Sequence, residues 1–164
     1  MPKIDLAKAP TRLGTAYPAP FDQPCLDRHR IKLGDAAGLD QFGVNLLRLP
    51  PGAWSSQRHW HTAEDEFTSV LEGEVVLVEN PQGDDGGETL MRAGDCAGFK
   101  AGVANGHHFQ NRSDRDVLLL EIGSRRPAED GCDYPDIDLV LREGEAVYRH
   151  RDGTPYDTDQ GRKR

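Results

Sequence analysis

Between residues 28 and 123, short runs of alternating polar and apolar residues are separated by turn residues. This alternation limits the possible fold more than any other feature of the sequence. Runs in which every second residue is apolar are typical of half-buried β-strands. The chain has 18 glycines and 11 prolines, which supply turns and interrupt long helices. No apolar stripe with a helical period and a helix's length occurs before residue 124. We therefore expect an all-β barrel or sandwich.

The expected strands are short and follow one another closely. Two turns also stand out, at 34–38 and in the loop 80–87, which is rich in Gly and Asp. A further extended stretch is expected at 58–61. The strands are expected at 29–33, 41–49, 66–71, 74–79, 88–92, 96–99, 107–111 and 116–122.

The length of 164 residues suits one domain, which we divide into three parts. Residues 1–27 contain five prolines and are expected to form an extended arm that lies over the barrel or a partner subunit, with a loose tail as the alternative that composition allows equally. Residues 28–123 form the barrel. Residues 124–164 are an irregular polar tail that packs on the barrel, with short strands or turns possible at 137–141 and 146–148.

Charge and composition exclude several classes of partner. The 28 acidic residues outnumber the 20 Lys and Arg, giving a formal charge of -8, so nucleic acid is not an expected partner. The basic end 162–164 is expected to be a frayed tail. The sequence has no apolar run long enough to span a bilayer and no signal-peptide pattern, so we expect no membrane association.

The cysteines indicate a reducing compartment. Their number is odd and none forms a CxxC pair, so a disulfide framework is not expected and the cytoplasm is the default location. The three are Cys25, Cys96 and Cys132, of which we interpret Cys96 as a buried small hydrophobic residue.

A pair of histidines carries the first chemical signal. His59 and His61 are two residues apart on an expected extended segment, so their side chains point to the same face. If that face is the barrel interior, the two imidazoles form half of a metal site. Glu66 begins the next strand and can add a carboxylate, and His107 begins a later strand and would complete three nitrogens and one oxygen.

These stretches resemble the two sequence motifs of the cupin superfamily. In the first, Gly52 precedes His59-Trp-His61, four residues separate His61 from Glu66, and six separate Glu66 from Gly73. In the second, Gly94 is followed by Lys100-Ala-Gly102, then by His107, with Asn111 after three intervening residues.

Three details depart from the family pattern. The spacer after Gly52 is one residue longer than usual, the spacer after Gly102 is two residues longer, and Lys100 replaces the usual proline. None removes a ligand. We expect Lys100 to be a solvated loop residue. The motifs cover 52–111, and the strand pattern extends the match to 41–123.

The resemblance implies an antiparallel double-stranded β-helix, or jelly-roll barrel. It also implies His59, His61, Glu66 and His107 as ligands of one divalent transition metal: Fe, Mn, Co, Ni, Cu or Zn. Asp65 is the fallback for Glu66, with Glu64 a further competitor. Alternation turns His108 to the opposite face, where we expect an outer-face residue.

The sequence and the family resemblance leave the class of reaction open. We expect a small-molecule metalloenzyme of the dioxygenase, isomerase or lyase type, in which Glu66 can also leave the metal and act as a base. The alternative is a non-catalytic module that binds or senses a small molecule or sugar. No basic cluster for a phosphate stands out, which tilts the expectation away from sugar phosphates.

A homodimer is expected, with the arm covering a sheet edge. Aromatic candidates for the pocket wall are Phe42, Trp54, Phe67, Phe99 and Phe109.

Overall fold

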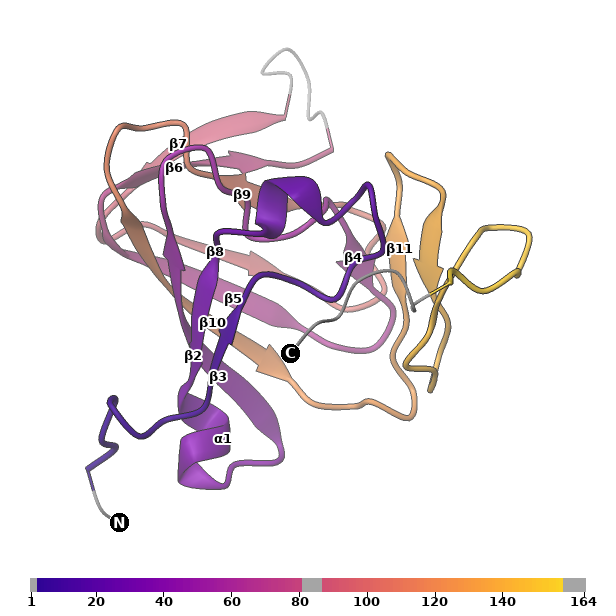
Figure 1. Ribbon diagram of the computed structural model, residues 1–164, viewed down its shortest axis with the longest axis horizontal. Helices are drawn as coiled ribbons and strands as arrows, with labels where there is room; N and C mark the ends of the chain where they lie inside the picture. The colour runs from indigo at the N-terminus through magenta and orange to yellow at the C-terminus, as the bar shows by residue number, and fades with distance from the viewer. Residues whose placement is uncertain (1–2, 81–86, 158–164) are drawn as a thin grey trace.

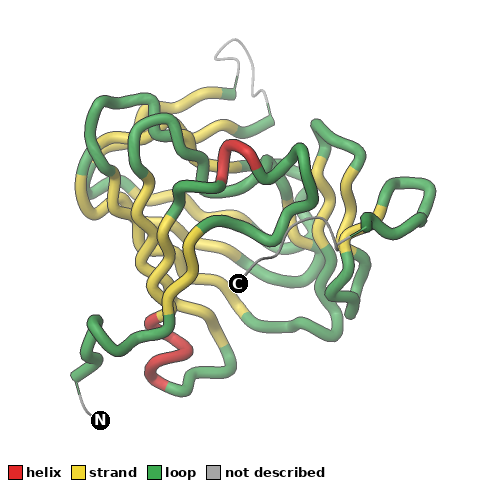
Figure 2. Tube along the Cα trace, in the orientation of Figure 1, coloured by secondary structure: helices red, strands yellow, loops and turns green. Residues whose placement is uncertain are grey.

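The computed structural model describes residues 3–80 and 87–157. Most of the loop expected at 80–87 and the basic end 162–164 therefore lie outside the described residues. Strands and loops make up nearly all of the described chain, and helix is confined to two short segments (Figure 2). These are η1 (Gln23–Cys25) and α1 (Leu33–Ala37). The all-β expectation is confirmed.

Two antiparallel sheets form the barrel (Figure 1). The larger has six strands in the order β1 (Thr11–Leu13), β2 (His29–Lys32), β3 (Phe42–Leu49), β10 (Val117–Ser124), β5 (Glu66–Glu72), β8 (Cys96–Phe99). The smaller has three strands in the order β7 (Glu88–Arg92), β6 (Glu74–Val78), β9 (His108–Gln110).

The main core lies between these two sheets. Alternate residues of the strands point into it, and removing each large apolar side chain from water contributes about 1.5–3 kcal/mol. Both sheets supply members of this cluster, which holds them face to face. The members are Leu47, Leu49, Ala53, Val70, Val75, Leu77, Met91, Phe109, Val117 and Leu119.

A third sheet covers one end of the barrel. Its order is β13 (Tyr148–Arg149), β12 (Leu139–Leu141), β11 (Cys132–Tyr134), β4 (Trp60–His61). Figure 1 shows β11 beside β4, with the following strands of the C-terminal segment in orange to yellow beyond it. A second apolar cluster forms on Cys132, Tyr134 and Leu139, and Tyr17 and Phe21 of the arm pack against it.

The arm therefore joins both parts of the molecule. Its β1 pairs antiparallel with β2 at the edge of the six-stranded sheet, a position that a proline-rich segment can occupy. Beyond β1, the arm continues to the second cluster at the C-terminal sheet.

The glycine of the first motif has a structural role. Gly73 connects β5 to β6 with a φ of +81°, a conformation that L side chains rarely adopt. A Cβ at this position would also lie 3.0 Å from the carbonyl oxygen of Asp116. Glycine is therefore required for this hairpin.

Several local expectations differ from the structure. The segment 34–38, expected as a turn, belongs to one turn of helix in α1, which Gly38 ends in the left-handed conformation. Cys96, expected to be buried, is exposed because β8 is the edge strand of its sheet. Strand β11 was not expected from the sequence.

His108 is the clearest local error. It was expected on the outer face but is only 4% exposed. Residues 54–56 run beside β9 and cover that face, so the Nδ1 of His108 lies 2.8 Å from the carbonyl oxygen of Ser56, and Trp54 packs against its ring. Alternation predicts the direction of a side chain but not what lies over it.

In the part of the chain that the structure describes, no helix has the length and apolar character needed to cross a bilayer.

Candidate metal centre

Three separate stretches of chain contribute the four candidate ligands. His61 lies in β4, Glu66 opens β5, and His107 immediately precedes β9. His59 and His107 form an isolated antiparallel bridge, with backbone N–H to carbonyl distances of 3.2 and 2.9 Å. This bridge brings the two sequence motifs side by side.

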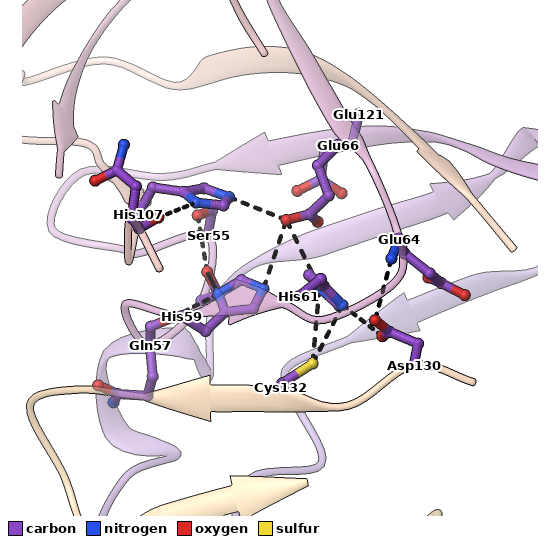
Figure 3. Close-up of polar contacts among 12 residues, drawn as sticks. Ser55, Gln57, His59, His61, Glu64, Glu66, His107, Glu121, Asp130 and Cys132 are labelled. Carbon is purple, nitrogen blue, oxygen red and sulfur yellow. Dashed lines mark hydrogen bonds and ion pairs between the residues drawn. The ribbon is translucent and has the colours of Figure 1, made fainter. Parts of the chain in front are cut away.

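The four side chains converge on one carboxylate oxygen (Figure 3). The Oε2 of Glu66 lies 2.9 Å from the Nε2 of His107, 3.6 Å from that of His61 and 3.8 Å from that of His59. Donor atoms of His59, His61 and Glu66 all lie within 4.8 Å of one another. His107 is outside this tighter group but contacts it through Glu66.

The second nitrogen of each imidazole has its own oxygen partner. The Nδ1 of His59 lies 2.9 Å from the carbonyl oxygen of Gln57, and that of His107 lies 3.1 Å from the carbonyl oxygen of Asn105. A carbonyl oxygen only accepts hydrogen bonds, so Nδ1 is the donor in both rings. The Nε2 atoms are therefore directed toward Glu66.

The acid–base states of two members of the cluster, His59 and Glu66, fit cation binding. Burial lowers the pKa of His59 to about 3, and the neighbouring imidazoles add to this effect, so His59 stays neutral with a lone pair. Burial alone would raise the pKa of Glu66. The contact with His107 and the positive charge of His61 outweigh burial and hold that pKa well below its usual range. Three imidazoles and an ionised carboxylate that face one another form a donor set suited to a divalent transition metal.

Two neighbours of His61 were not expected from the sequence. Asp130 is buried and its Oδ2 lies 2.6 Å from the Nδ1 of His61, while its Oδ1 accepts the N–H groups of Ala63 and Glu64. Cys132 places its Sγ 3.3 Å from the same Nδ1. Burial lowers the pKa of His61, but Cys132, Glu66 and Asp130 together raise it to about 10. No spacing rule identifies Asp130 or Cys132, because both lie beyond the motifs.

The alternative carboxylates have other partners. The Oδ1 of Asp65 accepts the N–H of Ala101 at 2.8 Å, and the Oε1 of Glu64 accepts the N–H of Arg126 at 2.5 Å. Neither forms an ion pair with the three histidines among the described residues, whereas Glu66 does so with all of them. The geometry favours Glu66 over the Asp65 fallback.

The cluster opens into a cavity of about 380 Å³. Its wall includes Tyr17 from the arm and Tyr134 and Tyr148 from the C-terminal sheet. The ring of Tyr134 stacks on that of His59 with centroids 5.6 Å apart. Segments outside the family motifs therefore enclose the site. Among the aromatic residues expected in a pocket wall, Phe67 and Phe109 line this cavity, Phe99 lines a second one, and Phe42 and Trp54 line neither.

Four arginines also line the large cavity: Arg12, Arg28, Arg30 and Arg125. The expectation that this protein has no basic cluster is therefore wrong. The arginines come from β1, β2, the segment before β2 and the segment after β10, so folding gathers cations that are dispersed in the sequence.

A second cavity of about 230 Å³ reaches the same cluster from another side. It is lined by His61, Glu66 and His107 together with Trp60 and Lys100. Lys100 is exposed, as expected, and faces this cavity.

Comparisons with known proteins agree with this geometry. The sequence model of the cupin domain matches residues 45–123. A crystal structure from Silicibacter pomeroyi, described as a sugar phosphate isomerase from the cupin superfamily, is 43% identical, with a TM-score of 0.85. The alignment covers 97% of this chain and 99% of that one. The chain belongs to the cupin superfamily, and its fold is the double-stranded β-helix, or jelly roll.

Two further solved structures are similar. One from Acidithiobacillus ferrooxidans, assigned provisionally as a sugar phosphate isomerase, is 30% identical over 75% of this chain and 74% of that one, with a TM-score of 0.64. One from Thermotoga maritima, described as a predicted oxalate decarboxylase, is 18% identical over 76% of this chain and 99% of that one, with a TM-score of 0.58, and supports the fold alone. No curated protein matches the sequence.

Proposed function

We propose that this protein is a metal-dependent isomerase that acts on a sugar phosphate. The observation that carries the proposal is the convergence of three imidazoles and one carboxylate in a cavity large enough for a small molecule. The end-to-end similarity to a cupin described as a sugar phosphate isomerase supports the class of reaction.

In this proposal, His59, His61, Glu66 and His107 hold one divalent metal. When bound, such an ion polarises a carbonyl or hydroxyl oxygen of the substrate. The Asp130 carboxylate fixes the orientation of His61. The stacked ring of Tyr134 limits the movement of His59.

Glu66 is the proposed proton carrier. Interconversion of an aldose and a ketose moves one proton between two adjacent carbons and a second proton, by way of solvent, between their two oxygens; the transfer between carbons requires a base that can also return the proton. The carboxylate of Glu66 is ionised, and its Oε2 is within hydrogen-bond distance of one imidazole, His107. Glu66 can therefore accept a proton from the carbon next to the carbonyl and deliver it to the neighbouring carbon.

Two further expectations belong to this proposal. The three free thiols are compatible with a cytoplasmic location. The homodimer likewise stays a prediction.

Elemental analysis of the purified protein, followed by NMR assays of sugar phosphates in D₂O, tests the proposal. We expect about one equivalent of a transition metal, and deuterium incorporation at the carbon next to the carbonyl. His61→Ala should lose both metal and exchange. His150→Ala is the matched control, since His150 pairs with Asp138 and stacks on Tyr156 at the surface.

Three results would contradict the isomerase. Tight binding of sugars without exchange would favour the binding module, uptake of dioxygen by the Fe(II)-loaded protein would favour an oxygenase, and full activity of the metal-free His61→Ala variant would remove the metal from the reaction.

A further inference from the structure

We propose that Arg125, supported by the other arginines of the large cavity, binds an anionic group of the substrate, a phosphate or a carboxylate. This proposal rests on the proposed function in one respect, the identity of the molecule that carries the anion. The binding site itself is argued from the charges and the register of the sheet.

Arg125 is an exposed cation without a counter-ion among the residues that the structure describes. It lines the large cavity, and its side chain forms no ion pair or hydrogen bond with residues 3–80 or 87–157. Its guanidinium lies over Gly43 of β3, where a Cβ would come within 2.7 Å of Nη2. The absence of a side chain at Gly43 therefore makes room for the guanidinium on the inner face of the sheet.

The sheet register places this guanidinium across from Glu66. Gly43 pairs with Gly123 on β10, and Gly123 pairs with Glu66 on β5. Directly opposed residues have side chains on the same face, so Gly43 and Gly123 leave bare backbone between the arginine and the carboxylate. Two strand spacings separate Gly43 from Glu66, or roughly 10 Å. A small sugar that carries a terminal anion fits this span.

Arg28 adds a buried positive charge to the same cavity. It is 5% exposed, and its Nε donates to the carbonyl oxygen of Gly14, while one terminal nitrogen donates to that of Ser55. No carboxylate forms an ion pair with it in the described part of the chain. The Arg28 guanidinium meets two carbonyl oxygens and lies over the ring of Tyr17, so an anion in the cavity lowers the electrostatic cost of burying it.

Arg30 is different, since Glu121 neutralises it. The two form a pair of hydrogen bonds of 3.0 and 3.3 Å. Glu121 pairs with Thr68, two residues along β5 from Glu66, and so lies beside the candidate metal centre. Among the described residues no carboxylate pairs with Arg125 or Arg28, and Arg125 is the more exposed of the two, which points to Arg125 as the residue in contact with an incoming anion.

Isothermal titration calorimetry of the protein, with its metal as purified, tests this site. The probes are ribose 5-phosphate, ribose, gluconate and inorganic phosphate. We expect ribose 5-phosphate or gluconate to bind at least tenfold more tightly than ribose, and Arg125→Ala to remove about tenfold or more of that affinity, as loss of a charge-assisted hydrogen bond does. Preference between the phosphate and the carboxylate identifies the anion.

Two variants separate contact from general charge. Arg126→Ala changes the net charge equally, but Arg126 pairs with Glu129 and does not line the cavity, so binding should be unchanged. Gly43→Ala keeps every charge and displaces the Arg125 guanidinium, so it should weaken anion binding while binding of ribose stays the same.

Equal losses in Arg125→Ala and Arg126→Ala, or equal affinities for ribose and its phosphate, would overturn the site. These affinities are measured without turnover, so they test the anion site separately from the proposed isomerase activity. If binding depends on Arg125 but no isomerisation occurs, the anion site stands and the proposed activity falls. If Arg125→Ala isomerises sugar phosphates as fast as the unchanged protein, the activity stands and the anion site falls.

Discussion

Asp130 shows how one buried carboxylate can serve both the fold and the candidate metal centre. Its Oδ1 holds the backbone of residues 63 and 64, and its Oδ2 accepts the Nδ1–H of His61. A carboxylate behind an imidazole fixes its orientation and increases its strength as a ligand. We therefore expect Asp130→Asn to keep the fold and lower metal affinity by about 10–100-fold.

Chelator competition measures that affinity directly. The control is Asp133→Asn, because Asp133 pairs with Arg151 at the surface. Asp130→Glu should recover part of the loss if the carboxylate is what matters. An Asp130→Asn protein with the affinity of the unchanged chain would show that His61 needs no partner.

At this scale, the sequence predicts what depends on local periodicity. His59 and His61 share a face because they are two residues apart, and the distance from Gly73 identifies Glu66. Asp130 and Arg125 could not be found in this way. Asp130 reaches His61 from 69 residues away, and Arg125 matters because of a glycine on another strand.

At the scale of elements, strands with strong alternation were predicted well, and short strands that depend on tertiary pairing were not. The strand at 88–92 has its observed bounds, because its pattern and flanking turns are both local. In contrast, β11 has three residues and pairs with β4 and β12 only in the folded chain. Its residues, with an aspartate between a cysteine and a tyrosine, give no strand pattern by themselves.

The C-terminal sheet is expected to determine the stability of the metal centre. Leu139 of β12 is fully buried against Cys132 and Tyr134. Leu139→Ala leaves a cavity and should lower the free energy of unfolding by about 2–5 kcal/mol. It should also weaken metal binding, because Cys132 begins β11 and Asp130 lies two residues before it.

Urea denaturation and metal titration of the same variant test both effects. Val147→Ala is the control, since Val147 is 40% exposed, and it should cost less than about 1 kcal/mol. If Leu139→Ala were destabilised with unchanged metal affinity, the sheet would support the barrel but not the site.

For the whole molecule, composition conceals the local charge. The chain carries a formal charge of -8, yet the cavity of about 380 Å³ beside the candidate metal centre is lined by four arginines. An acidic total argues against nucleic acid, but it says nothing about one pocket that the arm, the barrel and the C-terminal segment build together. The arginines become neighbours only after the sheets have formed, so sequence spacing could not reveal them.

The ion pair between Arg58 and Asp136 connects the barrel to the C-terminal segment and gives whole-molecule stability a pH dependence. Arg58 donates two hydrogen bonds to the carboxylate of Asp136, at 2.7 and 2.5 Å. These bonds hold the pKa of Asp136 below its usual range. Because the folded pKa is lower than the unfolded one, the stabilisation is fully present above the unfolded value, about 3.9, and is lost as the pH falls through the folded value.

Asp136→Asn should therefore lower the free energy of unfolding at pH 7 by about 0.2–1 kcal/mol, a small amount because the Asp136 side chain is 52% exposed and screened by solvent. The difference from the unchanged chain should shrink steadily as the pH is lowered below 4, because protonation removes the same interaction that the substitution removes. The midpoints of urea denaturation at a series of pH values measure this difference in stability. Asp114→Asn, at a carboxylate that is 92% exposed, should show no such convergence. A difference that stays constant down to low pH would mean that Asp136 stabilises the molecule through packing and not through its charge.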